Sequence, residues 1–191
     1  MSDVLAIIGR PNVGKSTLFN RLIGKRLALV ANEPGITRDY RVETLKVDDF
    51  SYDLIDTAGI EELSSDNISR ITKLSSIKAI DKADILIFVI DARSNLTSDD
   101  ISLASLIRKS GKKVVLVANK CEGLSIKQGE VDSLSFGFGI PVPISSEHNI
   151  GIPELLSSIK DISNFDTSDE LETSSYKKIT ILGRPNSGKS T

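Results

Sequence analysis

Two nine-residue segments of this chain have the residue types and the spacing of a phosphate-binding loop. They read GRPNVGKST at residues 9–17 and GRPNSGKST at residues 183–191. In the pattern G-x-x-x-x-G-K-[ST], backbone N–H groups surround phosphate oxygens, the lysine neutralises their charge and the hydroxyl ligates Mg2+. One chance match in a chain of this length has odds on the order of 1%, and these two copies also share Arg-Pro-Asn. We therefore predict a nucleotide-binding domain followed by the opening of a second one.

The two loops differ in the length of chain behind them. The first comprises Gly9, Arg10, Pro11, Asn12, Val13, Gly14, Lys15, Ser16 and Thr17. The second comprises Gly183, Arg184, Pro185, Asn186, Ser187, Gly188, Lys189, Ser190 and Thr191. Within this chain the second loop has no helix and no further nucleotide motif behind it. We expect a truncated second domain that binds no nucleotide here and whose loop functions only in a complete chain.

A second motif comes directly after the apolar segment that ends at Ile55. Asp56-Thr57-Ala58-Gly59 places a carboxylate at a strand end beside the first phosphate loop. A magnesium-facing aspartate belongs at that position, and the Gly59 N–H can sense a γ-phosphate. The alternative interpretation is an ordinary exit from a strand into a turn.

A third motif comes directly after the apolar segment 114–118. Asn119-Lys120-Cys121-Glu122 resembles the guanine-recognition motif NKxD, in which a carboxylate accepts hydrogen bonds from the guanine N1–H and exocyclic amine. Adenine offers no such pair of donors, so the carboxylate selects guanine. Glu122 is one methylene longer than the usual aspartate, which changes its reach. Ser145-Ser146 resembles the loop whose backbone contacts the guanine oxygen; solvated loops are the alternative interpretation of both segments.

Alternating strands and helices are expected to position these motifs. Unbroken apolar runs at residues 85–90 and 114–117 are typical of parallel strands buried on both faces. Further strands are predicted at residues 4–8, 41–47, 50–55 and 140–144, with a hairpin turn at Asp48-Asp49. Helices are predicted at residues 16–23, 68–79, 101–107, 125–134 and 151–160, the third capped by Thr97 or Ser98. This order predicts a doubly wound α/β fold with a mostly parallel sheet.

Length and composition bound the domain organisation. The 191 residues suit one domain plus a tail. We place the first domain at residues 1–160 and a disordered linker, rich in Ser, Thr, Asp and Glu, at residues 161–176. The first strand and phosphate loop of the second domain then occupy residues 177–191.

Charge and residue content argue against several classes of protein. The formal net charge of −2 gives no global basic field toward nucleic acid or anionic membrane, so neither DNA nor a membrane is an expected partner. The longest apolar run, residues 85–90, is far shorter than the roughly 20 residues of a membrane span. No basic leader precedes Asp3. The single Cys121 excludes an internal disulfide framework and is typical of a cytoplasmic protein.

Taken together, the motifs resemble those of translation-factor-class GTPases of the Era and TrmE group. The repeated phosphate loop is similar to that of one family, the tandem-GTPase ribosome assembly factors Der (EngA). The matching segments are both phosphate loops, PGITRD at residues 34–39, DTAGI at 56–60 and NKCE at 119–122. The resemblance implies a Ras-like G domain that hydrolyses GTP to GDP as a switch in large ribosomal subunit assembly. The alternatives are a nucleotide-gated binding module with negligible hydrolysis and an adenine-nucleotide protein.

The resemblance also implies roles for single residues. Lys15 contacts the β- and γ-phosphates, and Mg2+ is held by Ser16, by Thr37 when GTP orders its loop, and by Asp56 through water. The implied GTP-binding set comprises residues 9–17, Asp56, Thr57, Ala58, Gly59, Ile60, Asn119, Lys120, Cys121, Glu122, Ser145 and Ser146.

The residues available for the hydrolytic step depart from the Ras-like pattern. Ile60 occupies the position of the glutamine that orients water in Ras-like enzymes, and it cannot hydrogen-bond. Asn12 matches an asparagine that ligates K+ in potassium-activated relatives, and Arg38 is the rival source of positive charge. We therefore expect slow, potassium-activated hydrolysis that depends on Lys15, Asn12, Thr37 and Gly59.

Overall fold

The computed structural model of the chain describes residues 2–24, 41–57, 76–122 and 134–164. The strands are β1 (Asp3–Ile8), β2 (Arg41–Val47), β3 (Phe50–Asp56), β4 (Ile85–Asp91), β5 (Lys113–Asn119) and β6 (Val142–Pro143). The helices are α1 (Lys15–Leu22), α3 (Ser98–Ser110), α5 (Ile152–Asn164), a helical segment at residues 76–82 and a 3-10 turn, η2 (Leu134–Phe136).

The strands form one sheet in the order β2-β3-β1-β4-β5-β6. Among the described strands, only β2 runs antiparallel to its neighbour, and it joins β3 through a turn at Asp48-Asp49 in which Asp48 has φ 52°. The other neighbours are parallel, which requires crossover connections between them. The predicted doubly wound, mostly parallel α/β fold is therefore confirmed.

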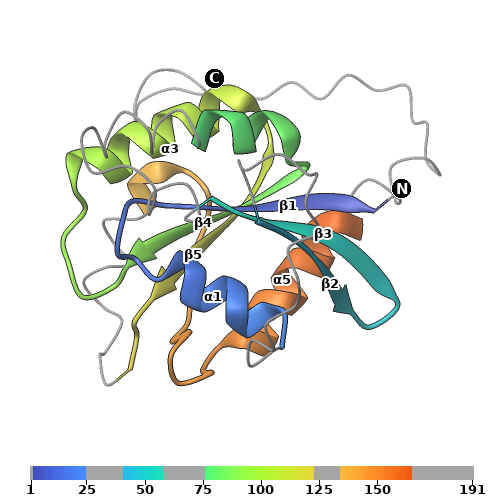
Figure 1. The fold of residues 1–191 in the computed structure, drawn as a ribbon. Coiled ribbons are helices and arrows are strands. Elements are labelled where there is room, and N and C mark those ends of the chain that lie inside the picture. Colours follow the sequence, from blue (N-terminus) through green and yellow to red (C-terminus); the bar gives the residue numbers. More distant parts are fainter. Residues whose placement is uncertain (1, 25–40, 58–75, 123–133, 165–191) are drawn as a thin grey trace, which may run out of the picture.

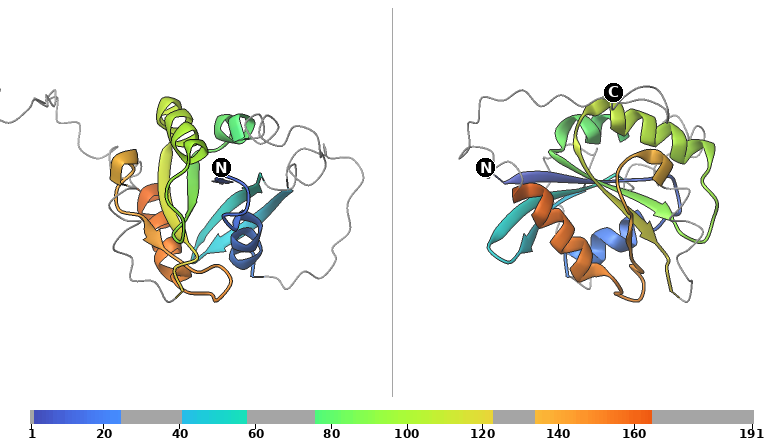
Figure 2. Two further views of the ribbon diagram at one scale, coloured as in Figure 1. Left: turned by 90° about the vertical axis from the view of Figure 1, so that its left-hand side faces the viewer. Right: turned by 180° about the vertical axis from the view of Figure 1, so that it is seen from behind.

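Helices cover both faces of the sheet. Figures 1 and 2 show α1 and α5 on one face, and α3 together with the helical segment 76–82 on the other. Strand β4 serves both cores because successive side chains of a strand point to opposite faces. Ile85, Ile87 and Val89 join the cluster with α1 and α5, whereas Leu86, Phe88 and Ile90 join the cluster with α3. Full burial of one such side chain contributes about 1.5–3 kcal/mol.

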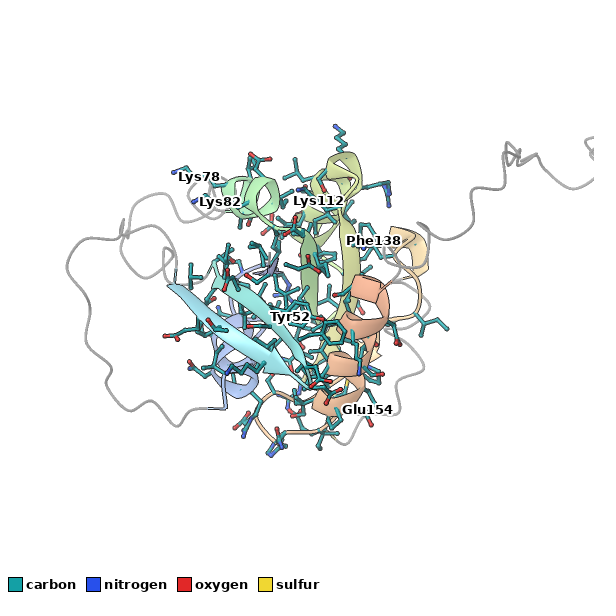
Figure 3. The ribbon with its side chains drawn as sticks, turned by 90° about the vertical axis from the view of Figure 1, so that its right-hand side faces the viewer. Tyr52, Lys78, Lys82, Lys112, Phe138 and Glu154 are labelled. Atoms are coloured by element: carbon teal, nitrogen blue, oxygen red, sulfur yellow. The ribbon has the colours of Figure 1, made fainter. Side chains whose placement is uncertain are left out.

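The interior and the surface are clearly separated in Figure 3. Tyr52 of β3 is only 1% exposed and lies inside the molecule, whereas Lys78 and Lys82 project from the outer surface of the helical segment 76–82. Across the described ranges, no helix combines the length and the apolar character that crossing a membrane requires.

Local chemistry explains where α3 begins and ends. Thr97, one of the two predicted caps, forms a capping box with Asp100: each side chain accepts a hydrogen bond from the other residue's backbone N–H. The helix ends at Gly111, whose φ of 65° is the left-handed conformation that glycine adopts without steric cost.

Two predicted elements differ in length from those observed. Strand β6 has two residues instead of the five expected at 140–144, because Pro141 and Pro143 have no N–H to donate to a ladder and Ile140 is exposed. Helix α5 continues past Lys160 to Asn164, and Ile162 packs against the core, so the boundary placed at residue 160 falls inside a helix. The helices predicted at 68–79 and 125–134, the rest of the linker and the second phosphate loop lie largely or wholly outside the described residues.

Candidate nucleotide-binding site

The predicted motifs meet at one edge of the sheet. The first phosphate loop connects β1 to α1, and β1 lies between β3 and β4. Asp56 ends β3 and Asn119 ends β5, so both residues reach the carboxyl edge where the phosphate loop lies. In open parallel sheets, ligands bind outside this edge.

Two glycines of the phosphate loop have no room for a side chain. A Cβ on Gly9 would lie 2.4 Å from the Val89 carbonyl oxygen. A Cβ on Gly14 would lie 2.4 Å from Asn119 Nδ2, and Gly14 also has φ 97°. Helix α1 begins directly after Gly14, and no side chain in the described part of the protein caps it there. This backbone leaves the helix N-terminus facing the loop, which is the geometry that binds phosphate.

Lys15 lies across the phosphate loop. Its side chain is buried, and its Nζ donates a hydrogen bond to the Arg10 carbonyl oxygen at 3.0 Å. An ammonium held over a ring of backbone N–H groups complements the negative charge of a polyphosphate.

Asp56 and Thr57 are fixed beside the phosphate loop by the β1–β3 pairing. Asp56 is 2% exposed and lies in register with Ile7, and Thr57 Oγ1 donates to the Ile7 carbonyl oxygen at 2.8 Å. The carboxylate of Asp56 and the hydroxyl of Ser16, in the first turn of α1, are hard oxygen donors of the type Mg2+ prefers, so the residues present fit this ion. Of the residues predicted for this first nucleotide site, Thr37, Ala58, Gly59 and Ile60 lie outside the described part of the chain.

Asn119 joins the phosphate loop to the loop after β6. Its Nδ2 donates to the Val13 carbonyl oxygen at 2.8 Å. Its Oδ1 accepts from the Ser146 N–H at 3.0 Å and from Ser146 Oγ at 2.9 Å. Because the Asn119 side chain is 2% exposed and satisfied on both sides, it fixes the spacing between two loops of the site.

Lys120 also links the phosphate loop to the sheet, through the exposed residue Asn12. Its Nζ donates to the Asn12 carbonyl oxygen at 2.7 Å and to Asp91 Oδ2 at 2.8 Å. Burial by itself would raise the pKa of Asp91. The hydrogen bonds from Lys120 and from the Arg93 backbone, with the charge of Lys120, outweigh burial and lower that pKa from its usual 3.8.

A cavity of about 380 Å³ opens beside these loops. It is lined by Gly14, Thr17, Asn119, Lys120, Glu122, Ser145, Ser146 and Glu147. Glu122 lines this cavity, and its carboxylate forms an ion pair with Arg93 through Oε1. The volume is in the range of small-molecule sites, and the lining carries donors and acceptors.

Several of these positioning residues were not predicted from the sequence. Arg21 of α1 donates from Nε to the Ser146 carbonyl oxygen at 3.0 Å and from Nη2 to that of Glu147 at 2.8 Å, which ties α1 to the cavity wall. Asp91 and Arg93 were also missed. Their position at the end of a buried strand, at the same edge as the phosphate loop, is the signal that points to them.

Arg10 belongs to the predicted nucleotide-binding set, but its side chain runs to α3. Its Nε lies 3.2 Å from Asp100 Oδ2, and its Nη2 donates to Ser94 Oγ. Arg10 therefore offers its backbone to the loop interior, and its guanidinium anchors the loop to the N-terminus of α3. Cys121 packs against the core, consistent with a small filler.

The doubly wound sheet, the glycine-dependent loop before α1 and the Asn119-centred cavity define the class: a phosphate-loop nucleotide-binding domain. The sequence profile of one family, described as 50S ribosome-binding GTPase, matches residues 4–120, which is more than half of the chain. The chain belongs to this family.

One relative and two solved structures illustrate the similarity. GTPase Der of Bartonella tribocorum is 44% identical over 218 aligned residues, which cover 100% of this chain and 46% of that protein. An Era variant of Aquifex aeolicus bound to GDP·AlF4− superposes with a TM-score of 0.67 at 26% identity, over 84% of this chain and 56% of that one. Era in complex with MgGDPNP and a segment of 16S ribosomal RNA gives a TM-score of 0.66, also at 26% identity, over 85% of this chain and 57% of that one. The chain thus spans about half the length of the curated relatives it matches.

Proposed function

We propose that this chain binds GTP and GDP with Mg2+ and hydrolyses GTP to GDP and phosphate. The arrangement of Asn119 carries the proposal: one buried carboxamide holds the phosphate loop and the Ser146 loop on either side of a cavity that Glu122 lines. In that cavity a carboxylate can accept from the two donors on the guanine edge. The family description and the GTPase relatives support this assignment.

The proposed roles of the chain's residues follow from their positions. Lys15 neutralises the β- and γ-phosphates, and the backbone N–H groups of the loop 9–17, in which only Pro11 has none, surround them. Ser16 and Asp56 hold Mg2+, joined by Thr37 in the GTP-bound state. When bound, Mg2+ neutralises charge that develops on the phosphate oxygens.

For hydrolysis, we propose a monovalent cation as the additional positive charge. Asn12 has φ 67°, an exposed side chain, and a carbonyl oxygen fixed by Lys120. This geometry supports Asn12 as a K+ ligand, in place of a water-orienting glutamine where Ile60 stands. Slow turnover in the absence of K+ is part of the same proposal.

The cellular role proposed for the chain is a nucleotide-dependent switch in large ribosomal subunit assembly in the cytoplasm. The family description names a 50S ribosome-binding GTPase, and the relatives carry the name GTPase Der. We further propose that residues 1–160, extended by the end of α5, are one GTPase domain. Residues 161–176 then link it to the start of a second domain at 177–191.

A comparison of GDP with ADP tests the base specificity. A ligand at about a thousand times its dissociation constant stabilises the folded state by roughly 4 kcal/mol. GDP with Mg2+ should therefore raise the melting temperature of the chain by several degrees, and ADP at the same concentration should not. Equal shifts with both nucleotides would contradict guanine recognition by Glu122.

A further inference from the structure

The ends of β4 and β5 carry two ion pairs side by side. Asp91 and Asn119 are register partners, and the pairing continues as the Ala92 N–H donates to the Asn119 carbonyl oxygen at 2.9 Å. Beyond this point Lys120 pairs with Asp91, and Glu122 pairs with Arg93. In the first pair the acidic residue belongs to β4 and the basic one follows β5. In the second pair the basic residue follows β4 and the acidic one follows β5. Each charged residue of the base-recognition motif thus has a partner in the segment 91–93.

Arg93 is itself held in place. Its backbone N–H donates to Asp91 Oδ1 at 3.0 Å, while the other oxygen of Asp91 accepts from Lys120. Its side chain is 52% exposed, so the guanidinium lies at the surface and not in the core, in contact with one residue of the cavity lining. A substitution at Arg93 therefore acts on its partner more than on folding.

The partner of Arg93 is a side chain that is longer than the usual one. Glu122 has one more methylene than the aspartate of NKxD, and with it one more rotatable bond to fix. Its side chain is only 19% exposed. Arg93 engages Oε1, whereas the buried Oε2 has no hydrogen-bond partner among the described residues. Oε2 is thus an unsatisfied acceptor on a residue that lines the cavity.

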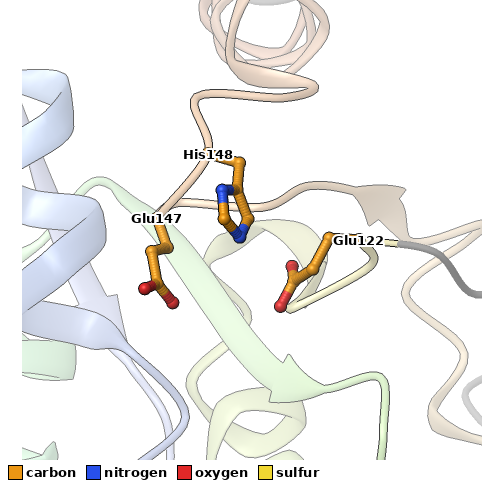
Figure 4. A group of neighbouring side chains, drawn as sticks. All are labelled: Glu122, Glu147 and His148. Atoms are coloured by element: carbon orange, nitrogen blue, oxygen red, sulfur yellow. The ribbon is translucent and has the colours of Figure 1, made fainter.

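Glu122 also faces a second acidic residue. Figure 4 shows Glu122, Glu147 and His148 turned toward one another, and one ligand atom of each lies within 4.8 Å of the others. Two neighbouring carboxylates repel one another, which favours displacement of the Glu122 side chain from its place. The Arg93 guanidinium offsets this repulsion. A metal ion is disfavoured at the same three side chains because Arg93 already supplies the cation to Glu122.

We propose that Arg93 is a specificity-determining positioning residue for the guanine base. By engaging Oε1 it fixes the long Glu122 side chain, so that the carboxylate accepts from the guanine N1–H and 2-amino group. The proposal rests on the proposed binding of guanine nucleotides. It assigns to Arg93 the task of adapting a glutamate to a position that an aspartate usually fills.

Dissociation constants for GDP, IDP and ADP, measured by isothermal titration calorimetry, test this role. Guanine presents two donors to the carboxylate and hypoxanthine presents one, so a misplaced Glu122 costs GDP more affinity than IDP. We expect Arg93→Ala to weaken GDP binding about tenfold and to reduce the GDP-to-IDP affinity ratio. Arg93→Lys keeps the positive charge but lacks the planar guanidinium donors, so it should recover part of the GDP affinity and part of the GDP-to-IDP ratio. Lys109→Ala, a charge-matched control on the exposed surface of α3, should change neither.

A double-mutant cycle separates positioning from a general loss of stability. The shorter side chain in Glu122→Asp does not reach Arg93, so removing Arg93 in that background should change GDP affinity by less than about twofold. A parent chain that binds GDP no better than ADP would defeat the proposed function. A parent that prefers GDP, with an Arg93→Ala variant that keeps both the affinity and the GDP-to-IDP ratio, would defeat the role of Arg93 alone. Equal losses for GDP and IDP would show a purely structural role and also overturn it.

Discussion

Gly14 lies in the phosphate loop at the start of helix α1 and against Asn119, the last residue of β5. Its φ of 97° is unfavourable for any side chain, and a Cβ would enter the space of the Asn119 carboxamide. The second glycine of G-x-x-x-x-G-K, Gly14, therefore permits the turn and also leaves space for the Asn119 side chain. It lets Asn119 reach the Val13 carbonyl oxygen, which links the two halves of the proposed nucleotide site.

Gly14→Ala should consequently lose more than backbone freedom. Left-handed conformation costs an L-residue roughly 1–2 kcal/mol, and the clash adds displacement of Asn119. Gly111→Ala is the matched control, since Gly111 has φ 65° and a Cβ there would meet none of the described atoms within 4 Å. Urea denaturation should show a loss of about 1 kcal/mol for Gly111→Ala and a larger one for Gly14→Ala, and only Gly14→Ala should weaken GDP binding. Similar GDP affinities for the two variants would argue against this coupling.

Lys15→Ala tests the phosphate half of the site. Removing a charged donor from a polyphosphate should weaken GDP binding about thirtyfold or more, since loss of one partner of a buried charged pair costs about 2–5 kcal/mol. Lys46→Ala, which removes an exposed lysine from β2, should leave the affinity unchanged. Calorimetric titration measures the dissociation constant of GDP for both variants. If Lys15→Ala binds GDP as tightly as the parent, the nucleotide does not bind at this phosphate loop.

Single residues of the site differ in how far the sequence reveals them. Asn119, Lys120 and Glu122 lie together in a segment that resembles a known motif, so their proposed role could be predicted from the local sequence. Arg21 contacts a carbonyl 125 positions away, and Arg93 meets a glutamate 29 positions away, across two strands. Contacts of this kind depend on strand order and register, which no local pattern encodes.

At the scale of elements, helix α3 supports the phosphate loop through its first turn. Asp100 closes the capping box with Thr97 and also faces the Arg10 guanidinium, although its side chain is only 2% exposed. A carboxylate at a helix N-terminus interacts favourably with the helix dipole. The Asp100 carboxylate thus both caps helix α3 and anchors the phosphate loop through Arg10.

Asp100→Asn should therefore affect both stability and ligand binding. It keeps the shape of the side chain but removes the charge opposite Arg10, so we expect a loss of about 1–3 kcal/mol in unfolding free energy and severalfold weaker GDP binding. Asp99→Asn, in the same turn but exposed, should cost only about 0.3–1 kcal/mol through the helix dipole and should not affect GDP. Equal effects of the two substitutions on GDP affinity would show that the Arg10 contact is not what holds the loop.

The ends of β4 and β5 make a prediction about pH. Because folding lowers the pKa of Asp91 below its unfolded value of 3.8, its contribution to stability is fully present above that value. The contribution is lost as the pH falls through the lower, folded pKa. Urea denaturation from about pH 6 downward should show the parent more stable than Asp91→Asn near neutrality, with the difference shrinking in strongly acidic solution. A difference independent of pH would mean that the Lys120–Asp91 pair contributes nothing.

Helices and strands could be predicted from the sequence where an apolar pattern is unbroken and no proline interrupts it. Strands β4 and β5 are continuous apolar runs and were found within a residue or two at each end. Strand β6 was overestimated because apolar content alone does not show that two prolines interrupt its ladder. The end of α5 was set by tertiary contacts, since Lys113 Nζ donates to the Ile162 carbonyl oxygen across the fold.

At the scale of the whole molecule, the sheet gathers groups from distant parts of the chain onto one edge. Residues after β1, β3, β4 and β5 meet there, and buried side chains fix the distances between them. The proposed hydrolysis depends on this whole assembly, because no single segment supplies the phosphate loop, the proposed metal ligands and the proposed cation ligand. The carbonyl oxygen of Asn12 is tied to β4 and β5 through Lys120 and Asp91, so this asparagine is placed by the whole edge of the sheet.

Single-turnover GTP hydrolysis in K+ and in Na+ tests the proposed use of that asparagine. Asn12→Gly removes the carboxamide without strain, because glycine tolerates a φ of 67°. The parent should hydrolyse GTP faster in K+ than in Na+, by about a hundredfold if the cation acts as one preorganised electrostatic contact. The Asn12→Gly variant should hydrolyse GTP at similar rates in the two salts. Asn149→Gly makes the same change at another exposed asparagine with positive φ, 59°, and should keep the K+ response. Equal rates in the two salts would remove K+ from the mechanism, and undetectable turnover in both would favour a nucleotide-gated binding module.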